Sequence, residues 1–276
     1  MNIVTTTSVF PPNYPADLAL RRLSRVGFSC LDMAFDYCTD PSHPFVGDGW
    51  REWARKLRET ADTLGIRYTH AHARGDASAR GTTVLRTMEA CKILGIKYLV
   101  IHPLHKKNGE IITDDDAFAE INAEAIRPLL PIAEENEVTI LSENLLWGSS
   151  IRPDVIARLV ETVDHPNFSW CFDTGHAHCS GIPISALRSI RAVPRSLHIQ
   201  DNSGESCKDE HLIPGDGTID WKEFLDLLRE IGYKGDLVLE AHHQSLDAAD
   251  EDREKILSEL LTRAKKMNAY SERKIH

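Results

Sequence analysis

The sequence predicts an α/β protein of the single-domain (β/α)8 TIM-barrel class, and three observations carry this prediction. Eight short apolar runs alternate with eight longer amphipathic stretches along the chain. Four of the amphipathic stretches end in a glycine that is followed by another apolar run, as expected where a helix gives way to a strand. The chain has 276 residues, and α/β barrels of about that length form one domain. We therefore expect one barrel to account for residues 1–276.

The eight predicted strands are short and rich in β-branched or aromatic residues. Polar residues, glycine or proline follow each run, which is typical of parallel strands that are buried on both faces. The runs are Ile3–Val4, Phe28–Met33, Ile66–His70, Tyr98–His102, Val138–Ser142, Phe168–Phe172, Ser196–Ile199 and Leu237–Glu240.

The predicted helices occupy the stretches between and after these runs. We expect Pro128 and Pro131 to kink or split the fourth helix, because proline lacks the backbone donor that a helix interior requires. Pro153 stands at the start of the fifth, where its missing N–H costs little. The stretches are Ala16–Val26, Trp50–Leu64, Thr82–Leu94, Ala117–Glu135, Pro153–Val163, Pro183–Val193, Trp221–Ile231 and Ala249–Met267.

Glycines mark four of the helix exits. Gly27, Gly65, Gly95 and Gly232 each stand where a left-handed cap would end a helix. The alternative α/β architecture, an open doubly wound sheet, normally has a glycine-rich phosphate-binding turn after an early strand. No such turn follows the first run, so the closed barrel is favoured.

Composition narrows the class of protein further. Hydrophobic residues make up 42% and charged residues 27% of the chain, which excludes disorder. The formal net charge of −10 argues against a nucleic-acid partner. No apolar run approaches ~18 residues, so we expect no membrane-spanning helix. The N-terminal residues lack the pattern of a secretory signal and the six cysteines form no CxxC pair, so we expect free thiols in a cytoplasmic protein.

Histidines and carboxylates gather where the predicted strands end. Ten of the 13 histidines lie at such an end or in the loop after it. Because the carboxyl ends of barrel strands converge on one axis, we expect these side chains to crowd together. The ionisable residues concerned include His70, His72, His102, Glu143, Asp173, His176, His198, Asp201, Asp209, His211, Glu240, His242 and His243.

Four of these side chains together indicate a metal site. Buried ionisable groups are costly without a partner, and a bound cation is the natural partner for several carboxylates in one place. The four are Glu143, Asp173, His198 and Glu240.

His70 and Trp147 lie near these strand ends but are not expected to bind the metal. We expect at most one of His70 and His72 to face the barrel axis, and His70 to pack behind the barrel or to cap a neighbour. Trp147, shortly after Glu143, is expected either to pack its loop or to form a wall of a substrate pocket.

The later strands resemble those of the xylose isomerase-like barrel superfamily, which contains sugar-phosphate isomerases and epimerases and also endonuclease IV. The similarity covers essentially the whole chain, and its most specific parts are residues 197–202 (LHIQDN) and 209–221 (DEHLIPGDGTIDW). Phe172–His176 and Leu237–Glu240 support it. The second strand departs from the pattern, because family members usually have glutamate where Asp32 stands.

The resemblance implies a sugar, sugar-phosphate or keto-polyol isomerase or epimerase with one divalent metal. Three carboxylates and one imidazole favour Mn²⁺, Mg²⁺ or Co²⁺, and Zn²⁺ is also compatible. The metal would stabilise the enediolate that forms when a proton is removed beside a carbonyl, and Glu143 and Glu240 would remove and return that proton. The choice among isomerisation, epimerisation and dehydration stays open, as does the choice between free and phosphorylated substrates. The residues that would hold the metal are Glu143, Asp173, His198 and Glu240.

The remaining strand-end groups are expected to bind the small sugar-like substrate. His176 would hydrogen-bond a substrate hydroxyl, as it does in similar epimerases. An arginine that some of these epimerases carry after the seventh strand is missing, because residues 202–205 are Asn-Ser-Gly-Glu. The oligomeric state stays open. The other expected substrate-binding residues are His72, His102, Trp147, Asp209 and His211.

A trinuclear-zinc AP endonuclease resembling endonuclease IV is the competing prediction. Residues 73–76 lack the tyrosine–leucine wedge that penetrates DNA in that nuclease, and Lys106-Lys107 is the only short basic cluster in the strand-end loops. A third class, a barrel that binds without turnover, is disfavoured because a simple binding site needs no pair of facing bases. All nine ligand types of the nuclease nevertheless have a match: His72, His102, Glu143, Asp173, His176, His198, Asp209, His211 and Glu240.

Overall fold

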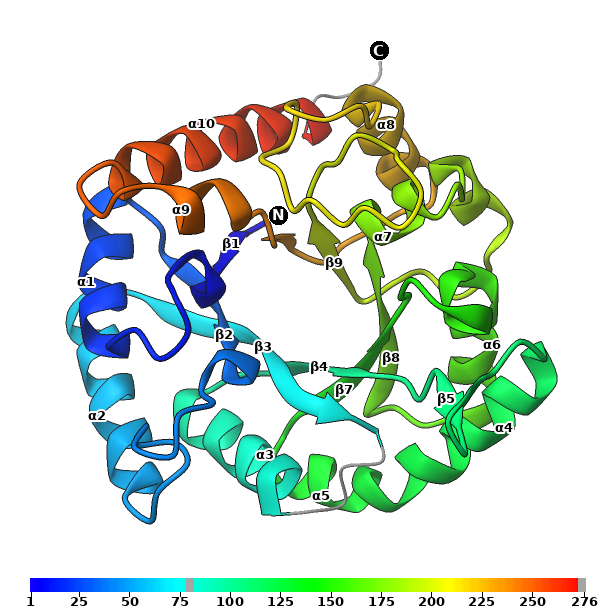
Figure 1. Cartoon of the computed structure of the whole chain (residues 1–276), viewed down its shortest axis with the longest axis horizontal. Helices are drawn as coiled ribbons and strands as arrows, with labels where there is room; N and C mark the ends of the chain where they lie inside the picture. The colour runs from blue at the N-terminus through cyan, green and yellow to red at the C-terminus, as the bar shows by residue number, and fades with distance from the viewer. Residues whose placement is uncertain (78–81, 273–276) are drawn as a thin grey trace.

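The computed structural model describes residues 1–77 and 82–272, and within them eight parallel strands close into a barrel. Helices surround the ring of strands (Figure 1). The predicted (β/α)8 barrel is therefore confirmed. Residues 78–81 and 273–276 of the predicted single domain lie outside the described residues.

The strands follow one another around the barrel in the order β1-β10-β9-β8-β7-β4-β3-β2. Two strands have the predicted bounds, most others differ by a few residues, and β3 extends well beyond its predicted end. An exposed antiparallel hairpin of β5 (Lys106–Lys107) and β6 (Glu110–Ile111), which was not predicted, follows β4. The barrel strands are β1 Ile3–Thr6, β2 Cys30–Ala34, β3 Arg67–Asp76, β4 Tyr98–His102, β7 Thr139–Glu143, β8 Phe168–Asp173, β9 Ser196–Ile199 and β10 Leu237–Leu239.

The helices on the outside of the barrel largely follow the predicted stretches. Those with close matches are α1 Ala16–Val26, α2 Trp50–Thr63, α3 Thr82–Leu94, α6 Pro153–Val163, α8 Trp221–Glu230 and α10 Arg253–Ser271. The fourth predicted helix is split into α4 (Asp115–Ile126) and α5 (Leu130–Glu135) by the 3-10 helix Arg127–Leu129, which confirms the effect expected of the two prolines.

Two predictions about helices were incomplete or wrong. The stretch Pro183–Val193 forms only the 3-10 helix Ile184–Ser189, because Pro194 disfavours helical geometry just before it and the stretch contains two serines. Two short helices in the strand-end loops, α7 (Thr174–Cys179) and α9 (His243–Asp247), were not predicted.

The four predicted glycine caps are confirmed. Gly27, Gly65, Gly95 and Gly232 have φ angles of 105°, 68°, 77° and 72°, in the left-handed region that favours glycine. Each therefore ends a helix and directs the chain into the next strand.

Alternation along the strands divides the apolar core from the polar mouth of the barrel. Outward side chains pack against the helices, as Phe172 does against Phe224 at a ring distance of 6.3 Å. Inward side chains form two small apolar clusters, Val4–Cys30–Val238 and Val100–Leu141–Cys171. At the carboxyl ends of the strands the inward positions carry ionisable groups instead.

Other features of the chain agree with the composition. The six cysteines are free, as predicted, and five of them are buried. Of the helices in the described part of the chain, none has both the length and the apolar character that a bilayer crossing requires.

Candidate metal centre

Four strands bring the predicted ligands to one point. Glu143 and Asp173 end β7 and β8, His198 lies within β9, and Glu240 directly follows β10. One donor atom from each of these side chains lies within 4.8 Å of the others. Strand alternation explains this, because Asp173 and His198 pair in the register of β8 and β9 and both point inward.

His198 connects two of the carboxylates. Its Nδ1 atom lies 2.9 Å from Oε1 of Glu143 and 3.3 Å from Oε2 of Glu240. Burial alone would lower the pKa of His198, but Cys171 and the two glutamates outweigh it and raise that pKa well above its usual range. The imidazole therefore occupies a strongly anionic position.

The carboxylates of this group fit a cation. Oε2 of Glu143 and Oδ2 of Asp173 are enclosed and have no hydrogen-bond partner among residues 1–77 and 82–272. Burial raises the pKa of Asp173 to about 7, and Glu143 and Glu240 add to the rise although His176 opposes it. A divalent ion would satisfy the unpaired oxygens and remove the repulsion between the carboxylates, so the residues present fit such an ion.

Two further histidines lie beside Glu143. Nε2 of His72 is 3.0 Å from Nε2 of His102, and these two atoms lie 3.6 and 3.5 Å from Oε2 of Glu143. Burial lowers the pKa of His72, but Asp36 and Glu143 outweigh this and raise it to about 9. His72, His102 and Glu143 thus form a second group with metal-ligand spacing.

A third group of this kind is centred on Asp209. Its Oδ2 atom lies 3.3 Å from Nε2 of His176 and 2.7 Å from Nε2 of His211. The other ring nitrogens bind backbone oxygens, Nδ1 of His176 that of Asn144 at 2.9 Å and Nδ1 of His211 that of Glu240 at 2.8 Å. Both rings are therefore held with Nε2 toward Asp209. Nine of the ten predicted site residues fall into the three groups.

Trp147 is the tenth predicted residue and lies in none of these groups. The residue is 45% exposed, and its ring packs at a tilt against the ring of His105, with 4.8 Å between the ring centres, next to the β5–β6 hairpin. This contact matches the loop-packing interpretation, and a role in substrate binding stays a prediction.

The expected position of His70 was wrong. His70 pairs with Asp32 and His72 with Ala34 in the register of β2 and β3, and the His70 ring lies 5.0 Å from that of Tyr98, which packs on the inner apolar cluster. His70 is therefore inside the barrel. Residues two apart in a strand point to the same side, so His70 and His72 share a face.

Asp32 occupies the inner wall of β2, where the resemblance left its role open. It is fully enclosed, and its Oδ1 atom has no partner in the described part of the chain. Burial raises its pKa to about 6, although His198 and His72 oppose the rise.

Three polar residues around the site were missed. The side-chain amide of Asn144 accepts a hydrogen bond from the backbone N–H of Asp173 and donates one to the backbone carbonyl oxygen of Asp173. The side-chain amide of Gln200 donates a hydrogen bond of 2.6 Å to the carboxylate of Asp209. Asp36 lies 3.9 Å from His72. Gln200 was predictable, because it lies two residues after His198 and so shares its inward face. Asp36 was not, because the pairing of β2 with β3 brings it to His72.

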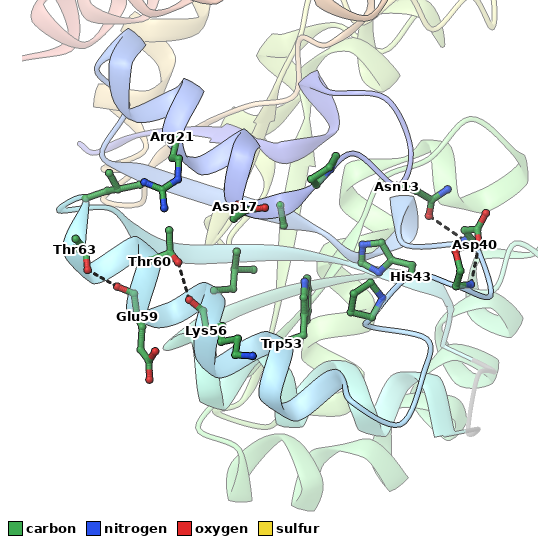
Figure 2. A pocket seen from close by; sticks show the side chains of 16 residues that line it. Asn13, Asp17, Arg21, Asp40, His43, Trp53, Lys56, Glu59, Thr60 and Thr63 are labelled. Carbon is green, nitrogen blue, oxygen red and sulfur yellow. Dashed lines mark hydrogen bonds between the residues drawn. The ribbon is translucent and has the colours of Figure 1, made fainter.

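A cavity of about 830 Å³ lies elsewhere, between α1, α2 and the loops before them (Figure 2). Trp53 and His43 meet there edge to face at 5.5 Å. None of the ten predicted site residues lines this cavity. The convergent buried ligands at the barrel mouth, rather than this groove, make the candidate functional site.

The structure thus combines a closed parallel barrel with carboxylates and imidazoles that converge at its strand ends. Residues 20–266 match the family model described as xylose isomerase-like TIM barrel. The chain belongs to this family, and the resemblance seen in the sequence is confirmed.

Individual curated relatives match only part of the chain, at low sequence identity. The inosose isomerase of Bacillus licheniformis is 29% identical over 154 residues, which cover 53% of this chain and 54% of that protein. The chain thus spans about half the length of this curated relative.

Solved structures are similar over nearly the whole chain. The IOLI protein with a bound zinc atom has a TM-score of 0.75 at 22% identity and covers 98% of both chains. D-psicose 3-epimerase in the presence of D-fructose has a TM-score of 0.74 at 15% identity, covering 97% of this chain and 99% of that one. At these identities the likeness concerns the fold.

Proposed function

We propose that the chain is a divalent-metal-dependent isomerase or epimerase that acts on a sugar or keto-polyol. The convergence of three carboxylates and one imidazole within 4.8 Å carries this proposal. The similarity to an inosose isomerase supports a cyclic keto-polyol as the first substrate to try. The free cysteines support a cytoplasmic location.

The four side chains of this group would hold the metal, for which Mn²⁺, Mg²⁺ or Co²⁺ is preferred and Zn²⁺ is compatible. When bound, the ion would supply positive charge to the carbonyl and hydroxyl oxygens of the substrate. The side chains that would hold it are Glu143, Asp173, His198 and Glu240.

Glu143 and Glu240 would carry the proton. Glu143 reaches Nδ1 of His198 from the end of β7 and Glu240 from directly after β10, with their oxygens at 2.9 and 3.3 Å. One carboxylate would remove a proton from the carbon beside the carbonyl, and the other would return a proton from the opposite side. Return to the same carbon gives epimerisation, and return to the neighbouring carbon gives isomerisation.

The neighbouring polar groups would orient the substrate. His176 and His211 are held by backbone oxygens, so their Nε2 atoms keep a fixed direction toward Asp209. Such fixed groups suit recognition of hydroxyl groups. His72, His102 and Trp147 would line the other side.

Solvent exchange in deuterated water tests this function. The protein, loaded in turn with Mn²⁺, Mg²⁺, Co²⁺ or Zn²⁺, is incubated with inososes, ketohexoses and their phosphate esters. We expect deuterium at one carbon beside a carbonyl in one substrate class, and no exchange after chelation. NMR of the product separates epimerisation, isomerisation and dehydration. Absence of exchange in every metal-loaded mixture would refute the proposal.

A trinuclear-zinc AP endonuclease is the second candidate, favoured by one observation. The described residues contain three groups with metal-ligand spacing, and together they include all nine predicted nuclease ligands. The rim of the barrel opposes it, because residues 200–220 hold six acidic residues and one lysine, and residues 240–252 hold five acidic residues and no lysine or arginine. Such loops would repel a phosphate backbone. Cleavage of an abasic-site duplex by the zinc-loaded protein tests this candidate.

A further inference from the structure

The cavity between α1 and α2 is lined by a histidine whose free nitrogen is a hydrogen-bond donor. His43 is only 8% exposed, and its Nδ1 atom accepts a hydrogen bond of 3.2 Å from the backbone N–H of Phe45. Burial lowers the pKa of His43, although Asp40 opposes this, so the ring is neutral at neutral pH. Its one proton is then on Nε2. That N–H has no partner among residues 1–77 and 82–272 and is not closed off by protein atoms.

Trp53 presents a second donor of the same kind to this cavity. Its ring meets that of His43 edge to face, and Figure 2 shows both side chains among those that line the cavity. The indole N–H of Trp53 has no partner in the described part of the chain, whereas those of Trp170 and Trp221 bind oxygen atoms. Indole N–H groups that are shielded from solvent usually have a partner. Two open donors in one cavity therefore indicate a ligand that supplies acceptors.

Donors and acceptors both line the cavity. Asn13 adds N–H donors, because its Oδ1 atom already accepts the backbone N–H groups of Thr39 and Asp40 at 3.0 and 2.9 Å. The carboxylates of Asp17 on α1 and Glu59 on α2 supply acceptors. A hydroxyl group both donates and accepts hydrogen bonds, so a molecule with several hydroxyl groups matches this lining.

The charges of the lining favour a neutral ligand. The acidic and basic side chains nearly balance: Asp17, Asp40 and Glu59 against Arg21 and Lys56. The carboxylates would repel a phosphate ester or another polyanion, and the open N–H groups would turn their positive ends toward a cation. The volume of about 830 Å³ lies within the range of small-molecule sites, which is about 300–1,000 Å³.

We propose that this cavity binds a neutral polyhydroxylated molecule, a sugar or a cyclic polyol, at a site separate from the candidate metal centre. The ring N–H groups of His43 and Trp53 donate to hydroxyl oxygens of the ligand, and ligand hydroxyl groups donate to Asp17 and Glu59. The indole ring of Trp53 packs against C–H groups of the ligand. The site is independent of the proposed function, because none of the four candidate metal ligands lines the cavity.

NMR of the indole N–H groups tests this site. Protein labelled with ¹⁵N-tryptophan gives one Nε1 signal for each of its five tryptophans, and Trp53→Phe assigns the signal of Trp53. The probes are myo-inositol, D-glucose and sucrose, with inorganic phosphate and tetramethylammonium as charged comparisons. We expect a saturable shift of the Trp53 signal with at least one neutral probe and with neither ion, while Trp170 stays unchanged. A Trp53 signal that no neutral probe moves, or that either ion moves, overturns the proposal.

Two variants and a matched control tie the shift to the cavity. Phenylalanine cannot donate, so we expect His43→Phe to raise the dissociation constant of the probe about 3- to 10-fold, measured at the Trp53 signal. Trp53→Phe should raise it by a similar factor, measured at the signals of the probe. The control is His165→Phe, because Nδ1 of His165 accepts the backbone N–H of Asn167 in the same way, at 3.1 Å, but His165 does not line the cavity. Unchanged binding in both cavity variants, or an equal loss in the control, contradicts the proposed contacts.

Discussion

At the scale of single residues, the candidate chemistry depends on two carboxylates that share one imidazole nitrogen. Glu143 and Glu240 each approach Nδ1 of His198.

Replacing either glutamate by glutamine keeps its shape but removes the base. We expect Glu143→Gln and Glu240→Gln to lower deuterium exchange by at least about 100-fold while circular dichroism stays that of the wild type. The control Glu205→Gln changes an exposed carboxylate and should keep full activity. Near-normal exchange in both site variants would contradict the proton-transfer roles.

His70 gives the fold a dependence on pH. Burial, with a smaller effect of His198, lowers its pKa from 6.5 to about 3. The unfolded chain takes up a proton near pH 6.5 and the folded chain does not, so stability falls as the pH drops from about 6.5 toward 3. The slope from this group approaches about 1.4 kcal/mol per pH unit. We expect His70→Phe to have a flatter decline in the free energy of unfolding between pH 6.5 and 5, measured in urea.

The control for this prediction is His243→Phe, because His243 is exposed. The control should keep the wild-type slope. A His70→Phe variant with that same slope would mean that His70 takes up a proton in the folded protein.

The residues of the candidate metal site could be predicted from the sequence, because in a barrel the carboxyl ends of the strands converge. Once eight parallel strands are recognised, the residues at their carboxyl ends must converge, which placed Asp173 and His198 together. Asp36 was beyond this rule, because its contact with His72 depends on the 3-10 turn after β2. The prediction for His70 was wrong although the sequence holds the signal, because residues 70 and 72 are two apart in one strand and therefore share a face.

At the scale of elements, the loop between β9 and α8 is organised by Asp201. Strand alternation turns Asp201 away from the metal centre and into the loop. There its carboxylate accepts hydrogen bonds from four N–H groups at 2.8 to 3.2 Å. Gly217 packs against it so closely that a Cβ there would lie 2.3 Å from Oδ1 of Asp201. The acceptor thus shapes the PGDG turn and holds the segment with Asp209 and His211 over the barrel. The donors are Asn202 N, Gly215 N, Ile219 N and Trp221 Nε1.

Removing this acceptor should be costly. We expect Asp201→Ala to lower the free energy of unfolding by about 3–5 kcal/mol, because several buried donors lose their partner. Asp220→Ala, which removes only the N-cap of α8 in the same loop, should cost about 1 kcal/mol. Urea unfolding measures both, and equal losses would show that Asp201 does not organise the loop.

Elements with strong periodicity and clear ends were predicted well, and short elements in loops were not. α1, α3 and α6 begin and end where apolar spacing, glycine and proline place them. The β5–β6 hairpin and the helices α7 and α9 are too short to show a period, and their contacts with the rim stabilise them. Pro183–Val193 had the apolar content of a helix, but the 3-10 helix ends at Ser189 and the backbone is already extended at Ile190.

At the scale of the whole molecule, barrel closure creates the site. Each contributing strand supplies only one or two ionisable side chains, and closure of the barrel brings these carboxylates and imidazoles to one enclosed region. They come from β2, β3, β4, β7, β8 and β9 and from the loop after β10. The acid-rich rim after β9 and β10 suits a small substrate better than a polyanion. The family and the fold were accessible from the sequence, because both depend on the order of elements and on strand-end motifs. The substrate was not, because strand order and strand-end motifs do not define the side chains of the loops around the site.

Anomalous scattering from crystals of the purified protein, combined with elemental analysis, tests the central claim most directly. The account predicts one divalent ion per chain, bound by Glu143, Asp173, His198 and Glu240. Three zinc ions per chain, with the further two at His72–His102 and at His176–Asp209–His211, would contradict the sugar isomerase and favour the nuclease. A protein that takes up no divalent ion at these four side chains would contradict both.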